Sequence, residues 1–396
     1  MSADASTVAE EGVHPRSRFA VARATRASTV ALGLAIPGIL LLLVLPAFAG
    51  RALLQELFYV FTILALAQLW NLLAGSAGLI SVGQQAFVGM GAYALFAFTL
   101  VTGLDPTLSI VLAGTISGLV AIPAALIVFR LRGAYFAIGT WVVAEVCRLV
   151  LAQVKQLGGG TGTSLPPDIA SSMVGLEYVR DLFAVRGPAA RDILAYWLAL
   201  ALAVGTFALV YRLLRSRRGL ALSAIGDSEV AAESTGVDVF RTKFLVYVLT
   251  AAGTGMVGAL IFLQKARISP DAAFSLIDWT AYVIFIVVIG GIGTMEGPII
   301  GVVIFYLLQY YLAALGSWYL MLLGVLAIVL MLFAPAGVWG VVSRYFNITL
   351  FPVRRRLIGK TFGLTIAGTA DHEGQPVAST LGPIDHLRLA QGTSLA

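Results

Sequence analysis

Two charged residues lie inside a long apolar run of this chain and could do chemistry there. Glu145 and Arg148 are three positions apart, so in a helix they share one face and can neutralise each other. Either charge alone at the middle of a bilayer would cost about 2.5–3.5 kcal/mol. The pair therefore has two interpretations, an ion pair that anchors one helix to its neighbours or a direct role along the path of a polar solute.

Uncharged polar side chains gather in a Gly-rich stretch. Residues 70–93 read WNLLAGSAGLISVGQQAFVGMGAY and include Asn71, Ser81, Gln84 and Gln85. Neutral amides and hydroxyls can hydrogen-bond across helices, or to a zwitterionic solute, without the cost of a full charge. Both roles stay open for these side chains. A soluble phosphate-binding loop is disfavoured, because no strand precedes the stretch and no basic residue follows it.

The residues needed for metal, redox or nucleophilic chemistry are sparse. Cys147 is the single Cys, and the three His residues lie in polar end segments. Gly359-Lys360-Thr361 resembles the end of a phosphate-binding loop, but the required earlier Gly is Arg354. We therefore expect no catalytic residues, no metal site and no bound cofactor, and the energy for active transport would have to come from another polypeptide.

The composition excludes a soluble protein. Of 396 residues 59% are hydrophobic and only 12% are charged, with a mean hydropathy of +0.93. Soluble domains carry about 25% charged residues. We predict an all-α polytopic membrane protein whose helices pack through Gly-x-x-x-Gly steps. The Gly residues of these steps are Gly114, Gly118, Gly293, Gly297 and Gly301.

Ten apolar runs are long enough to cross a bilayer core of about 30 Å. They span about residues 30–49, 53–73, 80–102, 107–129, 134–153, 193–214, 244–263, 278–293, 298–315 and 317–333. Lys and Arg near span ends are retained in the cytoplasm, which predicts that both termini lie inside. A rival reading makes the first run a signal peptide cut at Ala47-Phe48-Ala49.

The predicted layout has a transmembrane domain between two tails. It places a cytoplasmic tail at residues 1–29, the membrane domain at 30–344 and a cytoplasmic tail, expected to be poorly ordered, at 345–396. Residues 154–192 form a long outside loop that begins with Gly158–Gly162. Residues 215–243 form a long inside connector, with a short helix expected in its Ala-rich middle. This connector is interpreted either as a rigid knob that a motor subunit grips or as an amphipathic interfacial segment.

Several motifs, taken in order, resemble the LivM-type permease of branched-chain amino-acid ABC importers (the LivH/LivM family), over about residues 55–340. The motifs are residues 70–93, LRGAYFAIGTWVVAEVCR at 131–148, GGGTG at 158–162, RRGLALSAIGDSEVAAESTGVD at 217–238 and GGIGTMEGPIIG at 290–301. Each motif alone is modest evidence, whereas their joint order and spacing are specific. Gly226 and Thr163 depart from the family pattern.

The resemblance implies a multi-pass permease of the bacterial inner membrane that is not an enzyme. It implies as partners a second related permease subunit, two cytoplasmic ATPase subunits that bind the ATP, and a periplasmic substrate-binding protein. Nucleic acid is not an expected partner. Carried over residue by residue, the resemblance assigns ATPase coupling to Arg217, Gly219, Asp227, Glu229, Ala232 and Gly236. Glu145 and Arg148 match the family's E-x-x-R.

We therefore expect import of branched-chain or related amino acids by alternating access, driven by partner ATPases. Related permeases import urea, short amides or small organic acids, and these substrates stay open. An ion-coupled secondary transporter is disfavoured because acidic residues within the apolar runs are so few. An intramembrane enzyme is disfavoured because no nucleophile–base pair is evident.

Overall fold

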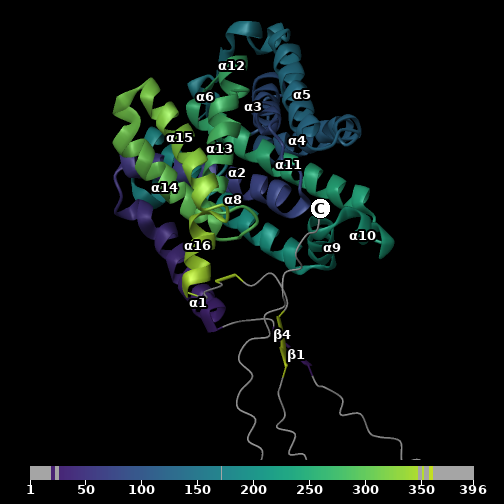
Figure 1. The fold of residues 1–396 in the computed structure, drawn as a ribbon. Coiled ribbons are helices and arrows are strands. Elements are labelled where there is room, and N and C mark those ends of the chain that lie inside the picture. Colours follow the sequence, from purple (N-terminus) through teal and green to yellow (C-terminus); the bar gives the residue numbers. More distant parts are fainter. Residues whose placement is uncertain (1–18, 23–25, 171, 347–349, 352–355, 360–396) are drawn as a thin grey trace, which may run out of the picture. The chain divides into compact units, whose positions relative to one another are not determined.

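The computed structural model describes residues 19–22, 26–170, 172–346, 350–351 and 356–359 (Figure 1). Most residues in this part of the chain are helical, which confirms the all-α prediction. The chain divides into two units, residues 23–355 and the end segments 1–22 with 356–396. Most of the two predicted tails, 1–29 and 345–396, lies outside the described residues.

Twenty-two helical segments and four short strands occur in the described ranges. The first half contains β1 (Phe19–Ala22), α1 (Arg26–Val44), η1 (Leu45–Ala47), α2 (Arg51–Asn71), η2 (Leu72–Ser76), α3 (Gln84–Val101), α4 (Pro106–Val128), α5 (Ala134–Ala152), η3 (Lys155–Leu157), η4 (Gly159–Thr161), β2 (Thr163–Ser164), α6 (Pro167–Ala170) and α7 (Leu176–Phe183). The second half contains α8 (Gly187–Arg215), α9 (Arg217–Asp227), α10 (Glu229–Ser234), α11 (Val239–Lys265), β3 (Arg267–Ile268), α12 (Pro270–Ala273), η5 (Ile277–Ala281), α13 (Tyr282–Gly290), α14 (Gly297–Leu312), η6 (Ala313–Leu315), α15 (Ser317–Phe333), α16 (Gly337–Phe346) and β4 (Arg356–Gly359).

Eight helices in the described residues are long and apolar enough to cross a membrane, and two shorter apolar helices accompany them. The shorter ones are Gly33–Ala47 and Gly297–Leu312. A helix occupies each of the ten predicted apolar runs, so the protein is a multi-pass membrane protein. The predicted count of ten crossings and the side on which the termini lie stay predictions.

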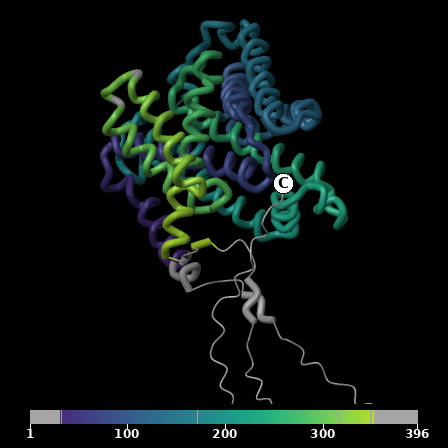
Figure 2. The backbone as a smooth tube through the Cα atoms, viewed as in Figure 1, coloured from purple at the N-terminus to yellow at the C-terminus, as the bar shows by residue number. Residues whose placement is uncertain are grey.

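Helix α11 lies at the centre of the unit formed by residues 23–355. It packs along α3 and α4, while α2 packs along α8 (Figure 2). Small residues permit the α3–α11 contact, because a Cβ on Gly91 would collide with the backbone of Gly255, and one on Gly258 with the backbone of Val88. Close approach through Gly is a common way to join helices in lipid, where no hydrophobic force draws them together.

A buried acid joins the ends of three central helices. Asp192 of α8 is 3% exposed. Its carboxylate accepts hydrogen bonds from Arg51 Nε at 2.8 Å, Gln264 Nε2 at 2.8 Å and Gln55 Nε2 at 3.3 Å. Arg51 and Gln55 belong to α2 and Gln264 to α11. The charge of Arg51 and the two amides together compensate for the burial of the carboxylate.

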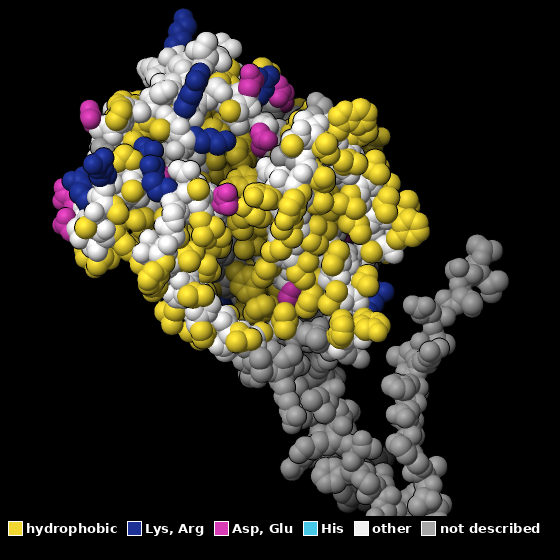
Figure 3. Space-filling model, turned by 90° about the vertical axis from the view of Figure 1, so that its left-hand side faces the viewer, with side chains coloured by type: hydrophobic (Ala, Val, Ile, Leu, Met, Phe, Trp, Pro, Cys, Tyr) yellow, Lys and Arg dark blue, Asp and Glu magenta, His cyan; other side chains and the backbone are white. Residues whose placement is uncertain are grey.

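The lipid-facing surface is apolar. Large exposed hydrophobic side chains occur along α1, α5, α14 and α15. Figure 3 shows a broad area of such side chains on one face, with charged side chains gathered in another part of the view. The apolar windows of α5 and of residues 318–346 are only 17% and 11% buried, so these helices lie at the periphery of the chain.

The end segments contribute one antiparallel strand pair. β1 pairs with β4 in the register Phe19 with Gly359 and Ala22 with Arg356. A second strand pair lies within the unit of residues 23–355, where β2 pairs with β3 through Thr163 with Ile268. It joins the segment after Gly158–Gly162 to the segment that follows α11.

Candidate functional site

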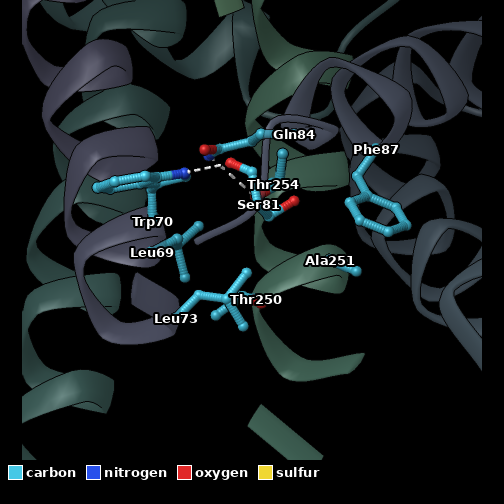
Figure 4. Close-up of a pocket in the computed structure, with 9 residues that line it drawn as sticks. All are labelled: Leu69, Trp70, Leu73, Ser81, Gln84, Phe87, Thr250, Ala251 and Thr254. Atoms are coloured by element: carbon cyan, nitrogen blue, oxygen red, sulfur yellow. Dashed lines mark hydrogen bonds between the residues drawn. The ribbon is translucent and has the colours of Figure 1, made fainter. Parts of the chain in front are cut away.

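A narrow cavity lies where α2, α3 and α11 meet the segment 77–83 (Figure 4). Its lining residues are Leu69, Trp70, Leu73, Ser81, Gln84, Phe87, Thr250, Ala251 and Thr254. The volume open to the centres of water molecules is about 10 Å³, which is near the minimum for one water. The cavity therefore combines a few neutral polar groups with an apolar wall. In this conformation it is too small for an amino acid.

The cavity lies beside a non-helical break between the second and third apolar runs. Sequence analysis expects a helix from residue 80, but the structure has the π-helical turn η2, then a non-helical segment, and α3 begins only at Gln84. Trp70 Nε1 donates to the carbonyl of Ser81 at 2.8 Å, and the Val82 N–H donates to Thr140 Oγ1 at 3.1 Å. These bonds satisfy backbone groups that a helix would otherwise pair, which is required inside a bilayer.

Gln84 faces the cavity with an unused acceptor (Figure 4). Its Nε2 donates to the carbonyl of Leu66 at 3.1 Å and to Thr254 Oγ1 at 3.5 Å. Its Oε1 is buried and has no hydrogen-bond partner in the described part of the chain. A buried acceptor without a partner is uncommon and costly. Gln84 and Ser81 are thus the predicted residues that the structure brings together at the cavity.

Asn71 lies elsewhere and has a different set of contacts. Its Nδ2 donates to the carbonyl of Thr294 at 2.8 Å, and its Oδ1 accepts the N–H of Gly293 at 2.8 Å. Gln68 donates to the carbonyl of Met295 at 3.0 Å. The two amides thereby hold the loop before α14 against α2.

Gly75 permits the contact between α2 and the loop before α14, and we predict that a larger residue at this position lowers the stability of the protein. An added Cβ would lie 2.5 Å from the backbone N of Gly293. Gly75→Ala is therefore expected to displace the loop from Asn71 and to cost about 1–3 kcal/mol, measured as a lower thermal stability in detergent. The matched control is Gly205→Ala, since Gly205 has open space around it in a helix. Equal stability of the two variants would contradict this contact.

Gln85 is the neighbour of Gln84 but points to another helix. Its Oε1 accepts a hydrogen bond from Thr280 Oγ1, and its backbone N–H donates to Thr280 Oγ1 at 3.2 Å. Thr280 lies in the π-helical turn η5 and is fully buried. The structure therefore separates the two adjacent glutamines, one at the cavity and one in an interhelical contact.

Glu145 and Arg148 form the ion pair that their spacing allows, away from the cavity. Arg148 Nη2 lies 2.6 Å from Glu145 Oε1, and Arg148 Nη1 lies 2.8 Å from Asp271 Oδ1. The side chains of Arg148, Glu145 and Asp271 are 28%, 44% and 84% exposed. Asp271 is not evident as a partner from the sequence, because nothing in the sequence places the short helix α12 beside α5. The cluster lies on a peripheral helix near its C-terminal end.

The Gly-rich turn after α5 is built from left-handed backbone. Gly158, Gly159 and Gly162 have φ values of +85°, +56° and +81°. An added Cβ on Gly162 would collide with the carbonyl of Ile268 in β3. These residues thereby let β2 reach β3, which joins the loop at 154–192 to the end of α11.

The connector at 215–243 contains two helices where one was expected. Ser228 ends α9 and caps α10, with its Oγ accepting the N–H of Ala231 at 3.3 Å. Gly219 packs so closely on the carbonyl of Leu214 that a Cβ would collide. Ala232 is 2% exposed, and Gly236 has φ +84° at the turn before α11. The remaining predicted coupling residues, Arg217, Asp227 and Glu229, are exposed at the helix ends.

Four of the five glycines singled out for packing lie against other helical segments, whereas Gly297 lies against the loop that precedes its own helix. Cβ atoms added to Gly114 and Gly118 would meet Met256 and Ala252 of α11, at 3.3 Å for Gly118 to Ala252 Cβ. Residue contacts of the same kind place Gly293 against Gly75, Gly297 against Thr294, and Gly301 against Ile286.

Besides Asp192, two further buried charged residues in the described part of the chain are not evident from the sequence. Lys243 is 9% exposed and pairs with Glu229 of the connector. Glu296 is 7% exposed, and its carboxylate accepts the N–H groups of Leu350 and Phe351 at 3.1 and 2.8 Å. Both lie at the ends of apolar runs, where the sequence does not reveal whether a charge reaches solvent.

Comparison with known proteins supplies the family. The model of a family described as the permease component of a branched-chain amino acid transport system matches residues 53–334. The chain belongs to this permease family. The matched range contains the cavity, the connector and the cluster around Arg148. Members of the family are transport components, so the interpretation as an enzyme is excluded.

The relatives found include two bacterial proteins described as high-affinity branched-chain amino acid transport system permease protein LivM. The one from Salmonella typhimurium is 30% identical over 280 residues, 67% of this chain and 65% of that protein. The one from Escherichia coli is 28% identical over 332 residues, 74% of this chain and 77% of that protein. A probable LivH permease from Methanocaldococcus jannaschii is 29% identical over 149 residues, 35% of this chain and 45% of that protein. No solved structure matches the chain.

Proposed function

We propose that this permease is the transmembrane subunit of an ATP-driven importer for branched-chain or related amino acids in the bacterial inner membrane. It pairs with a second, related permease, two cytoplasmic ATPases that bind ATP, and a periplasmic substrate-binding protein. Substrate crosses by alternating access. The names of the LivM and LivH relatives support the substrate class and a second permease in the same transport system. The ATPases and the binding protein are what the resemblance of the sequence motifs to ABC importers implies.

One observation carries the mechanism, namely that the connector and the cavity share a hydrophobic cluster. Leu222 of α9 is 1% exposed and belongs to the same cluster as Leu73 and Phe87, which line the cavity. A force applied to α9 from the cytoplasm therefore reaches the cavity wall through packed side chains, which are poorly compressible. A motor subunit that moves the connector can thus open or close the cavity.

The cavity chemistry supports a zwitterionic substrate. The free Oε1 of Gln84 can accept from an ammonium group, and the hydroxyls of Ser81 and Thr254 can donate to a carboxylate. The wall formed by Leu69, Leu73 and other apolar residues suits an aliphatic side chain. Because the cavity holds about one water, alternating access must enlarge it before an amino acid enters.

The cluster of Arg148 with Glu145 and Asp271 is proposed as an earlier contact on the same path. It combines a guanidinium with two carboxylates, so it can attract both ends of an amino acid. Its partly exposed side chains and its place near the loop at 154–192 suit a site that receives substrate from the binding protein.

The buried acids argue against an ion-coupled carrier. In the described part of the membrane domain the buried carboxylates are Asp192 and Glu296. The first is compensated by Arg51 and two amides, and the second accepts two backbone N–H groups. Both carboxylates therefore have structural partners, and the described part of the membrane domain offers no unpartnered buried carboxylate of the kind that marks a coupling-ion site.

Co-isolation tests the assembly. The tagged chain, purified in mild detergent from its native host, is expected to bring with it an ATPase and a second permease. Recovery of the chain alone, as an active single-subunit transporter, would contradict the proposal. Binding assays on the soluble partner with leucine, urea and small organic acids then decide among the substrates that the family allows.

Gln84 provides a test of the cavity. Gln84→Leu is expected to raise the KM for leucine uptake at least several-fold, because the loss of a hydrogen bond to a charged group costs about 1.5–3 kcal/mol. The matched control is Gln85→Leu, which removes an adjacent buried amide that faces Thr280. A KM for Gln84→Leu equal to that of the control, at equal membrane abundance, would exclude substrate contact at this residue.

A further inference from the structure

Lys243 is the one buried Lys or Arg within the described ranges, and its partner lies in the connector. Its Nζ donates to Glu229 Oε1 at 2.5 Å. The Lys243 side chain is 11% exposed and that of Glu229 is 58% exposed. A lysine this buried needs a partner to remain charged. One carboxylate oxygen of Glu229 therefore contacts α11. The rest of the side chain is exposed on the face where an ATPase would bind.

The ion pair adds to an apolar contact between the same elements. Ala232 of α10, Ile225 of α9 and Val239 of α11 form a small buried cluster. The two connector helices are thereby attached to the first turns of α11 by both packing and charge. A displacement of the connector then has to move the start of α11 or break these contacts.

Helix α11 leads from this attachment to the cavity. Thr250 and Thr254 line the cavity and follow Lys243 by seven and eleven residues. These spacings are close to two and three helical turns, so the three side chains share one face, and the distances along the axis are about 10 and 16 Å. Gly255 of the same helix is in close contact with Gly91 of α3.

We propose that the Lys243–Glu229 ion pair is a positioning element that makes α11 follow the connector, so that ATP-driven movement reaches Thr250 and Thr254. This inference rests on the proposed function. It assigns Lys243 a role in energy coupling, in addition to the packing of Leu222 in the cluster that includes Leu73 and Phe87.

A second ion pair at the same helix end supplies a matched control. Arg241 Nε lies 3.0 Å from Asp238 Oδ2, and these side chains are 86% and 51% exposed. The pair joins residues of one turn and does not reach the connector helices α9 and α10. Exposed pairs of this type contribute little to stability. Lys243→Gln and Arg241→Gln therefore remove the same charge, with and without a link to helices α9 and α10.

The experiment uses the complete complex in proteoliposomes and measures leucine uptake and ATP hydrolysis together. Lys243→Gln is expected to lower the leucine transported per ATP hydrolysed at least about tenfold, the effect of ~1.4 kcal/mol of coupling free energy. Arg241→Gln is expected to leave the ratio unchanged. Exchanging the two charges in Glu229→Lys/Lys243→Glu is expected to restore most of the ratio, which a purely local packing defect would not allow.

An unchanged ratio in Lys243→Gln, or a charge-exchanged variant as poorly coupled as the single one, would overturn the inference. If Lys243→Gln does not reach the membrane, Glu229→Gln tests the same pair from its exposed side, with the same expected loss. Failure of the proposed function has a different signature, because the unmodified complex would then show no ATP-dependent uptake at all.

Discussion

Arg51→Met is expected to destabilise the permease by about 3 kcal/mol, the lower end of the range for breaking a buried ion pair. The substitution leaves Asp192, with a side chain that is 1% exposed, without its countercharge. The lower end applies because the Arg51 side chain is itself 56% exposed and because Gln55 and Gln264 still donate to the carboxylate. The measurement is the fraction of protein that stays folded in detergent during a thermal ramp.

A charge-neutral double variant separates this effect from a loss of packing. Arg51→Met/Asp192→Asn removes both charges and is expected to recover most of the stability. Arg180→Met, at an exposed position on α7, is expected to change the stability by less than about 0.5 kcal/mol. If the double variant were no more stable than Arg51→Met, the buried carboxylate would not be the cause.

Leu220→Asp is expected to abolish ATP-dependent uptake while the chain still inserts into the membrane. Leu220 is 67% exposed on α9 and Val230 is 78% exposed on α10, so the connector presents large apolar side chains outward. The buried core of a protein interface is more apolar than the rest of the surface and is depleted of charged residues. A carboxylate there would oppose docking of the ATPase, and the measurement is the amount of ATPase that co-purifies.

Val174→Asp is the control for this prediction. Val174 is 68% exposed, and it lies in the loop predicted on the other side of the membrane. The variant introduces the same charge at similar exposure and is expected to leave ATPase co-purification unchanged. Normal recovery of the ATPase with Leu220→Asp would remove α9 from the docking surface.

The sequence predicts the helices well because each helix that crosses a bilayer needs about 20 consecutive apolar residues. It predicts a break between the runs 53–73 and 80–102 but not its position, since the structure has helix through residue 76 and the break at residues 77–83. That break depends on tertiary partners, since Trp70 and Thr140 must supply the hydrogen bonds that replace the helical ones. Ser is a favoured N-cap residue, so Ser228 is a local signal for the division of the connector into two helices. The Ala-rich pattern around it favours a single helix instead.

The candidate site was predicted in part. The polar residues of the stretch at 70–93 were identified as a set, but the set splits between the cavity, an interhelical contact and a loop contact. Gln84 meets Thr254, which is 170 residues away, and such a long-range contact leaves no local pattern. In the sequence Lys243 is one of several basic residues near a span end. Its burial follows from the packing of α9 and α10 against the start of α11.

Leucine accumulation by reconstituted vesicles distinguishes an ATP-driven importer from an ion-coupled carrier. Proteoliposomes that contain the chain with its second permease and ATPases, supplied with binding protein outside and ATP inside, are measured for leucine accumulation. The account predicts accumulation that requires ATP and every partner, and none when the chain alone is given a proton or sodium gradient. Accumulation by the chain alone on such a gradient would contradict it.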